Sequence, residues 1–137
     1  MKVLVDTSAW IAVLVPSDAH HAHAKGVFAD LLAGNALVVT SNYIIDETVT
    51  WLRMHASHTA AVSFHDTITQ SQEHNRLHLA WVTEAVEKKA WDLFTRHPGL
   101  KLSLTDCTSA VLAAELKLPI WSYDSDFVAL GCQEWAS

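Results

Sequence analysis

The chain has 137 residues, of which 50% are hydrophobic and 18% charged, so it can bury one core and is not a disordered polyelectrolyte. Nine Lys and Arg residues against fifteen Asp and Glu give a net charge of −6, which argues against a protein that binds nucleic acid through a generally basic surface but not against one that meets phosphates through bound metal. Cys107 and Cys132 form neither a disulfide framework nor a zinc motif, so we expect a cytoplasmic protein. The longest apolar run, at 9–15, is too short for a membrane span, and no targeting segment is predicted.

In chain order, short apolar segments alternate with longer segments of helical periodicity. Strands are predicted at 2–6, 36–40, 75–80 and 118–123, with a candidate edge strand at 131–135. Helices are predicted at 7–15, 19–33, 42–55, 57–73, 83–95 and 104–117, with a short helical segment after Asp126. The expected caps of three helices are Thr7 or Ser8, Ser41 or Asn42, and Ser103. This alternation predicts a single α/β domain over residues 1–137, with a mostly parallel sheet and a site beyond the carboxyl ends of its strands.

Three carboxylates fall at or near those strand ends. Asp6 and Asp124 directly follow predicted strands, although Asp in such places is also a common cap or turn residue. Asp106 lies three residues after Ser103, and this Ser-x-x-Asp spacing favours a capping box. The same spacing places the Asp106 carboxylate in the first turn of its helix, near the open strand ends, so the two roles can coexist.

Glu47 is the fourth carboxylate. On a helical wheel it lies inside the apolar arc of its helix, whereas its neighbour Asp46 lies on the polar side. A core-facing Glu needs a partner, a proton or a metal ion unless its stem carries it to solvent at the rim. Four converging carboxylates raise one another's pKa, and a divalent cation relieves that conflict. Oxygen ligands without Cys suit Mg²⁺ or Mn²⁺, and such ions promote phosphoryl displacement, so the sequence predicts a metal-dependent phosphodiesterase or nuclease.

The order and surroundings of these acids resemble the PIN domain and, more closely, the VapC-type ribonuclease toxins of toxin–antitoxin pairs. The matching motifs are Val5-Asp6-Thr7-Ser8, Thr40-Ser41-Asn42 with Glu47, Leu104-Thr105-Asp106-Cys107, and Tyr123-Asp124-Ser125-Asp126-Phe127. The resemblance covers essentially the whole chain. It implies a PIN-like three-layer α/β/α sandwich around a central, mostly parallel sheet.

The resemblance also implies the activity and its residues. Catalysis and metal binding would share four acids: Asp6, Glu47, Asp106 and Asp124. Asp126 matches a position that is often acidic but less central. Hydrogen bonds that orient ligands or water would come from three hydroxyl residues: Thr7, Ser8 and Ser122. The implied reaction is Mg²⁺-dependent (or Mn²⁺-dependent) endonucleolytic cleavage of RNA by a cytoplasmic, type II toxin that dimerises and is held inactive by a cognate antitoxin.

The chain departs from the family habit in its basic residues, since only Lys101 and Lys117 lie between Gly99 and Ser137. Basic contacts to RNA would then come from earlier residues: Lys25, Arg53, Arg76, Lys88, Lys89 or Arg96. Two other classes stay open. One is a phosphotransferase of haloacid-dehalogenase type with Asp6 as nucleophile, although Ser8 stands where that chemistry places a second Asp. The other is a catalytically silent α/β binding module.

Three further features carry expectations. The nine histidines form no metal motif, and we expect them on the surface. Trp10 and Trp51 lie on predicted core-facing stripes. The first helix is apolar nearly all round, so it is either fully buried or covered by another chain, and we expect it to contribute to a dimer or antitoxin surface.

Overall fold

The structure is a computed structural model that describes residues 1–135. Its sheet strands are β1 (Lys2–Val5), β2 (Leu37–Ser41), β3 (Leu77–Ala80) and β4 (Ile120–Trp121). Its helices, within the described residues, are α1 (Thr7–Leu14), α2 (His21–Ala33), α3 (Asn42–His55), α4 (His58–Glu73), α5 (Glu84–Arg96), α6 (Leu104–Leu116) and α7 (Asp126–Ala129). Every strand pair is parallel, and the strand order is β3-β2-β1-β4.

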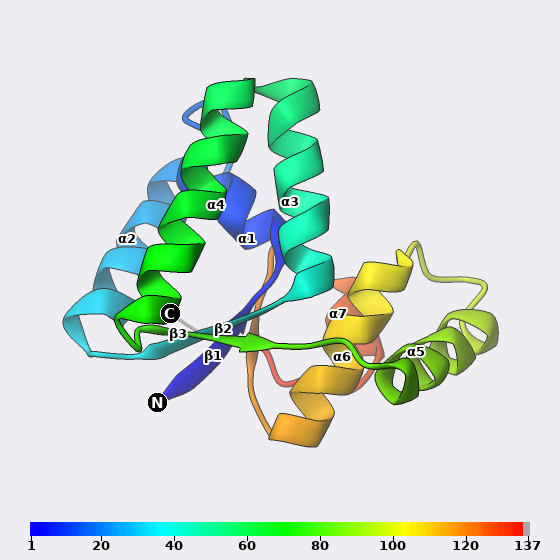
Figure 1. Cartoon of the computed structure of the whole chain (residues 1–137). Coiled ribbons are helices and arrows are strands. Elements are labelled where there is room, and N and C mark those ends of the chain that lie inside the picture. Colours follow the sequence, from blue (N-terminus) through cyan, green and yellow to red (C-terminus); the bar gives the residue numbers. More distant parts are fainter. Residues whose placement is uncertain (136–137) are drawn as a thin grey trace.

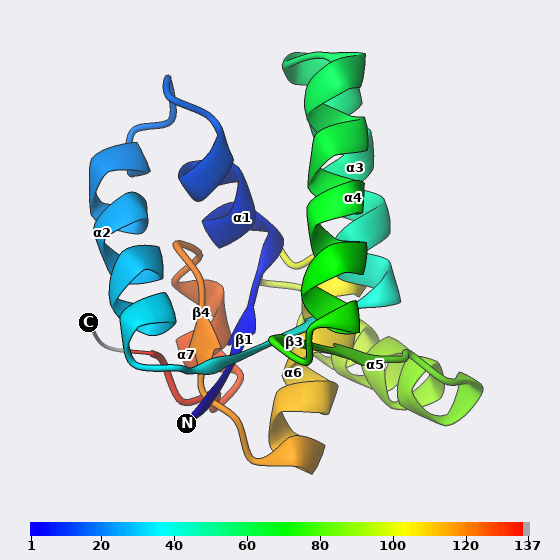
Figure 2. The same ribbon diagram turned by 60° about the vertical axis from the view of Figure 1, so that its left-hand side comes forward.

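Helices cover both faces of the sheet. In Figures 1 and 2, α1 to α4 lie on one side of the strands, and α5 and α6 lie on the other. Strands covered in this way bury both faces, which explains why Val3, Leu4 and Val5 are all fully buried. The parallel three-layer α/β/α arrangement predicted from the sequence is confirmed.

The order of the strands creates a switch point. From β1 the chain passes through α1 and α2 to β2, and through α3 and α4 to β3, moving in one direction across the sheet. After α5 and α6 it returns and adds β4 on the opposite side of β1. In open parallel sheets, ligands bind beyond the carboxyl ends of the strands at such a reversal. Here the reversal lies between β1, which Asp6 follows, and β4, which Ser122 and Asp124 follow.

Polar side chains start several helices as expected. Ser41 caps α3 by accepting a hydrogen bond from the Ile44 N–H at 3.0 Å. Ser103 and Asp106 form the complete capping box of α6. The expected cap of α1 is wrong, because Asp6 itself fills that position with extended backbone (φ −75°, ψ 161°) and its side chain accepts from Ser8 N–H. The carboxylate that ends β1 therefore also starts α1.

Two boundaries and the last strand also differ from expectation. Helix α2 begins at His21 rather than at residue 19, and β4 contains only Ile120 and Trp121. The backbone N–H groups of Tyr123 and Asp124 donate to serine hydroxyls, which ends the ladder early. The candidate edge strand at 131–135 is reduced to one isolated parallel bridge between residues 120 and 134.

Helix α1 is buried within its own chain. Ala9 and Ala12 are fully buried, and Trp10 is only 5% exposed, with its ring edge-on to Phe28 and Phe64 at centroid distances of 5.9 and 5.5 Å. The rings of α2 and α4 thus cover Trp10 within the chain, whereas Leu14 at the end of α1 is 41% exposed. The expected contribution of this helix to a dimer or antitoxin surface stays a prediction. Within residues 1–135, no helix combines the length and the apolar character needed to cross a membrane.

Candidate active site

Asp6 is the most deeply placed acid at the carboxyl edge of the sheet. Its side chain is 2% exposed, and burial raises the pKa of its carboxyl group because the charged form loses its hydration. Hydrogen bonds from Ser122, from Ser8 and from nearby backbone N–H groups lower the same pKa but do not cancel the effect of burial. The Asp6 carboxylate is therefore held in place at an electrostatic cost.

The two oxygens of Asp6 have different surroundings. Oδ2 accepts hydrogen bonds from the hydroxyls of Ser8 and Ser122, each at 2.8 Å. Oδ1 is buried and has no hydrogen-bond partner among residues 1–135. An unpaired buried carboxylate oxygen is costly, so its presence requires an explanation. A cation that binds at Oδ1 would supply one.

Ser122 connects β1 to the loop that follows β4. Its hydroxyl donates to Asp6 and accepts from the backbone N–H of Asp124 at 2.9 Å. Asp124 Oδ1 in turn accepts from the backbone N–H of Asp126 at 2.9 Å. The orienting positions expected at Ser8 and Ser122 thus hold Asp6 and Asp124 in a shared network. The hydroxyl of Thr7, expected to act in the same way, is buried and makes no hydrogen bond within the described residues.

Asp106 and Glu47 come from the two helices that face this edge. Asp106 is fixed by the capping box, in which its Oδ2 accepts from Ser103 N–H at 3.0 Å. Glu47 is half-buried on α3, whereas Asp46 is exposed, as the helical wheel predicts. Burial, together with the negative charges of Asp6, Glu47 and Asp124, raises the pKa of Asp106 to about 7, against the lowering effect of the Ser103 hydrogen bond.

The effect of three neighbouring acids on the pKa of Asp106 places all four carboxylates within electrostatic reach of that group. They lie after β1, on α3, on α6 and in the loop after β4. They do not form a closed cage, because no three Asp, Glu, His or Cys side chains of the described chain lie close enough together to hold one ion. Mutual repulsion favours such separation when no cation is bound. The buried, unpaired oxygen of Asp6 and the raised pKa of Asp106 are both relieved by positive charge, so this donor set fits a divalent cation.

The sequence did not indicate one contact beside this network. His20 stacks on Tyr123 with ring centroids 4.3 Å apart, and His23 Nδ1 lies 2.7 Å from the Tyr123 hydroxyl. Both histidines are exposed, as expected, but they also brace the residue between Ser122 and Asp124. The clustering of histidines at 20–23 is visible in the sequence, but nothing in the sequence indicates that they contact Tyr123.

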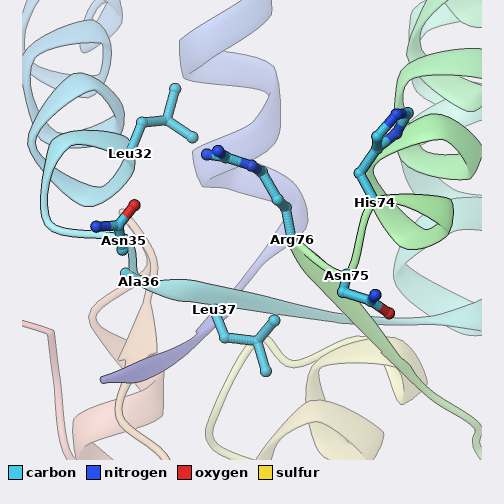
Figure 3. A pocket seen from close by; sticks show the side chains of 7 residues that line it. All are labelled: Leu32, Asn35, Ala36, Leu37, His74, Asn75 and Arg76. Carbon is cyan, nitrogen blue, oxygen red and sulfur yellow. The ribbon is translucent and has the colours of Figure 1, made fainter.

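A hollow at the other end of the sheet lies away from the acids. It has a volume of about 270 Å³, and Figure 3 shows Arg76 pointing across it between α2 and α4. Leu37, which lines it, begins β2, and Arg76 directly precedes β3, so the hollow lies at the amino ends of these strands. Arg76 is therefore a poor candidate for a basic contact at the acidic edge.

The family model for the PIN domain matches residues 3–131. The chain therefore belongs to the PIN-domain family, which confirms the resemblance seen in its motifs and leaves the haloacid-dehalogenase alternative without support. Nucleases of this family typically use a divalent metal ion.

Two relatives and one crystal structure that are at least 30% identical to this chain are VapC proteins. The chain is 32% identical over 133 residues to the 23S rRNA-specific endonuclease VapC20 of Mycobacterium tuberculosis, covering 96% of each. It is 30% identical over 141 residues to a VapC ribonuclease of Archaeoglobus fulgidus, covering 100% of this chain and 87% of that protein. The crystal structure of M. tuberculosis VapC20, described as a sarcin–ricin loop cleaving toxin, gives a TM-score of 0.81 at 30% identity, over 97% of this chain and 98% of that one. FitAcB from Neisseria gonorrhoeae, at 16% identity and a TM-score of 0.67, shares the fold.

Proposed function

We propose that this chain is a metal-dependent endoribonuclease and the toxin of a type II toxin–antitoxin pair. The observation that carries the proposal is the buried, unpaired Oδ1 of Asp6 at a switch point where three further acids converge, in a chain of the PIN-domain family. Mg²⁺ is the proposed cofactor, with Mn²⁺ as its substitute, since both prefer oxygen ligands. The proposed ligands are Asp6, Glu47, Asp106 and Asp124, with Asp126 close by.

The chain's own residues hold this site in order. Ser8 and Ser122 fix one oxygen of Asp6 and leave the other free to bind. The capping box keeps Asp106 at the first turn of α6, where its carboxylate faces the other acids. A bound divalent cation supplies Lewis-acid stabilisation of the phosphoryl oxygens and lowers the pKa of water. The acids thus provide a binding site for the cation that promotes cleavage of a phosphodiester bond.

The first substrate to test is 23S rRNA at its sarcin–ricin loop. That choice rests on the VapC20 relative, which is described as a 23S rRNA-specific endonuclease and a sarcin–ricin loop cleaving toxin. Because ribosomes are in the cytoplasm, a protein that cleaves this substrate would act there. A cognate antitoxin and a homodimer are the proposed partners, and co-expression of the toxin with the neighbouring gene product, followed by size measurement, tests both.

The decisive experiment measures cleavage of purified ribosomes by primer extension. Wild-type protein should cleave with Mg²⁺ or Mn²⁺ and stop with EDTA, and Asp6→Asn should abolish cleavage while the fold is kept. Asp46→Asn is the matched control, because it removes the same charge from the exposed side of α3. Cleavage that survives both EDTA and Asp6→Asn would refute the metal mechanism. Absence of any RNA cleavage by the wild type would favour the silent binding module.

A further inference from the structure

A hollow beside α5 combines exposed aromatic rings with positive charge. It has a volume of about 400 Å³ and lies between α5 and the loop at 97–102 that leads into α6. Trp91 and Phe94 line it, with side chains 55% and 40% exposed. Their rings stack on each other with centroids 5.3 Å apart and planes 13° apart. Two large apolar rings left in water at one place indicate a surface that meets a partner.

The charge around this α5 hollow is unusual for a protein of net charge −6. Its titratable lining residues are His97 and Lys101, and no lining residue within the described chain is acidic. Lys101 is exposed and makes no ion pair or hydrogen bond with any residue of 1–135. By contrast, three basic residues considered as RNA contacts are already paired with acids: Lys88 with Glu84, Lys89 with Glu115, and Arg96 with Asp92.

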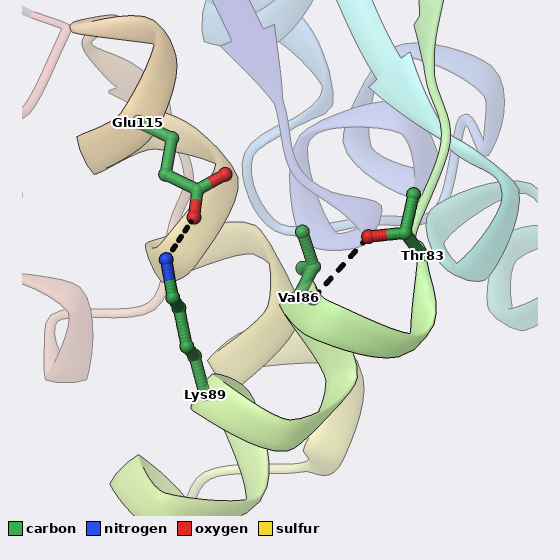
Figure 4. Close-up of polar contacts among 4 residues, drawn as sticks. All are labelled: Thr83, Val86, Lys89 and Glu115. Atoms are coloured by element: carbon green, nitrogen blue, oxygen red, sulfur yellow. Dashed lines mark hydrogen bonds and ion pairs between the residues drawn. The ribbon is translucent and has the colours of Figure 1, made fainter.

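Helix α5, which lines the hollow, packs against α6, the helix that carries Asp106. Figure 4 shows Lys89 of α5 paired with Glu115 of α6 at 2.7 Å, and Thr83 capping α5 through the Val86 N–H at 3.3 Å. Leu102, which also lines the hollow, is 8% exposed and packs in the hydrophobic core. Figure 1 shows the loop after α5 running back to the first turn of α6.

Chain geometry then links Lys101 to the acids. Lys101 precedes the cap Ser103 by two residues, so their Cα atoms can be at most about 7 Å apart. Ser103 N–H is hydrogen-bonded to Asp106 Oδ2 at 3.0 Å. An RNA strand whose phosphate contacts Lys101 would therefore pass close to the Asp106 carboxylate.

We propose that the α5 hollow is a subsite for an unstacked base of the RNA substrate. Trp91 and Phe94 provide the stacking surface, and Lys101 contacts a neighbouring phosphate. Aromatic side chains bind bases of single-stranded RNA through their faces, and this stacking tolerates any sequence. An RNA strand can use both features of the hollow, because its bases stack on the rings and its phosphates pair with the unpaired cation. An acidic protein surface would pair with the cation but would leave the rings without a stacking partner. The inference rests on the proposed ribonuclease function and names its substrate as single-stranded or looped RNA.

The test is a binding cycle between protein and RNA. Protein carrying Asp6→Asn, which does not cleave, is titrated in Mg²⁺ with a fluorescein-labelled oligoadenylate and with its abasic counterpart. We expect the bases to strengthen binding, and Trp91→Ala to weaken oligoadenylate binding about five- to a hundredfold while leaving abasic binding unchanged. Trp91→Phe should restore much of the loss. Met54→Ala, a change at a 73% exposed apolar residue of α3, is the matched control and should have no effect.

Two further readouts separate the contributions. Lys101→Ala should reduce the slope of log Kd against log salt by about 0.7, the value for one phosphate contact on a single strand. Lys2→Ala, at an exposed residue that begins β1 at the end of the sheet away from the acids, should not. In the cleaving protein, Trp91→Ala should raise KM without lowering kcat.

The inference is overturned if Trp91→Ala leaves oligoadenylate binding unchanged, or if it weakens binding of both RNAs equally. It is also overturned if the change affects only the size of the protein in solution, because the rings would then cover a second copy. Failure of the ribonuclease proposal is a different result, namely a wild-type protein that cleaves no RNA in Mg²⁺.

Discussion

Replacing Asp106 by Asn should stabilise the metal-free protein above neutral pH. The pKa of this carboxyl rises from 3.8 to about 7 on folding, mainly through burial and then through the charges of Asp6, Glu47 and Asp124. A raised carboxyl pKa destabilises the folded state, since the unfolded chain loses its proton first. This contribution is absent below about pH 4, grows as the pH rises towards 7 and is constant above that.

The size of the effect follows from the shift. Roughly three pKa units at about 1.4 kcal/mol each give an upper limit of about 4 kcal/mol, and partial exposure of Asp106 reduces this to about 2 kcal/mol. Asn keeps an oxygen that can accept from Ser103 N–H, so the cap is preserved. The lost attraction between a charge and the first turn of α6 costs only about 0.5 kcal/mol. The net gain at pH 8 is then about 1.5 kcal/mol, or roughly 4 °C in Tm.

Thermal unfolding in EDTA at pH 5 and pH 8 measures this directly. Asp106→Asn should raise Tm clearly at pH 8 and by less than half as much at pH 5. Asp46→Asn, with the same charge change on the exposed side of α3, should shift Tm little at either pH. Addition of Mg²⁺ or Mn²⁺ should raise the wild-type Tm more than that of Asp106→Asn. An equal gain at both pH values, or a loss at pH 8, would refute the reasoning.

Three other outcomes are expected. Ser122→Ala removes a 2.8 Å hydrogen bond to Asp6, and we expect about tenfold weaker divalent-ion binding by calorimetry, with a similar loss in cleavage rate. Ser103→Ala removes the cap of α6 and should cost about 1 kcal/mol, near 3 °C in Tm by calorimetric scanning; an unchanged Tm would contradict the cap's role. Phe127→Ala, at a side chain only 1% exposed, should cost about 3 to 5 kcal/mol in urea unfolding, and a cost below 1 kcal/mol would show that α7 is dispensable.

The sequence predicts the layers and the placement of the acids well, because both follow from local patterns. Apolar strands that alternate with amphipathic helices leave few arrangements other than a covered parallel sheet, and helical periodicity separates Glu47 from Asp46. The Ser-x-x-Asp spacing likewise predicts the capping box of Ser103 and Asp106, which the structure shows. The convergence of these acids follows from the topology, since parallel strands end at one edge.

The features that sequence reasoning missed depend on contacts between distant residues. Nothing local indicates that Tyr123 lies against His20, or that serine hydroxyls end β4 after two residues. The covering of Trp10 by Phe28 and Phe64 is of the same kind. An apolar helix can equally be buried by its own chain or by another, and only the three-dimensional arrangement decides between them.

The bond between Ser122 and Asp6 joins residues 116 positions apart in the sequence. The two serines that orient Asp6 are thus 114 residues apart, and Ser122 is synthesised long after Ser8. The acidic centre can therefore assemble only after the ribosome has released the chain through Asp124. Fragments that end before residue 122 lack both this bond and Asp124, so incomplete translation or C-terminal trimming yields products without the centre.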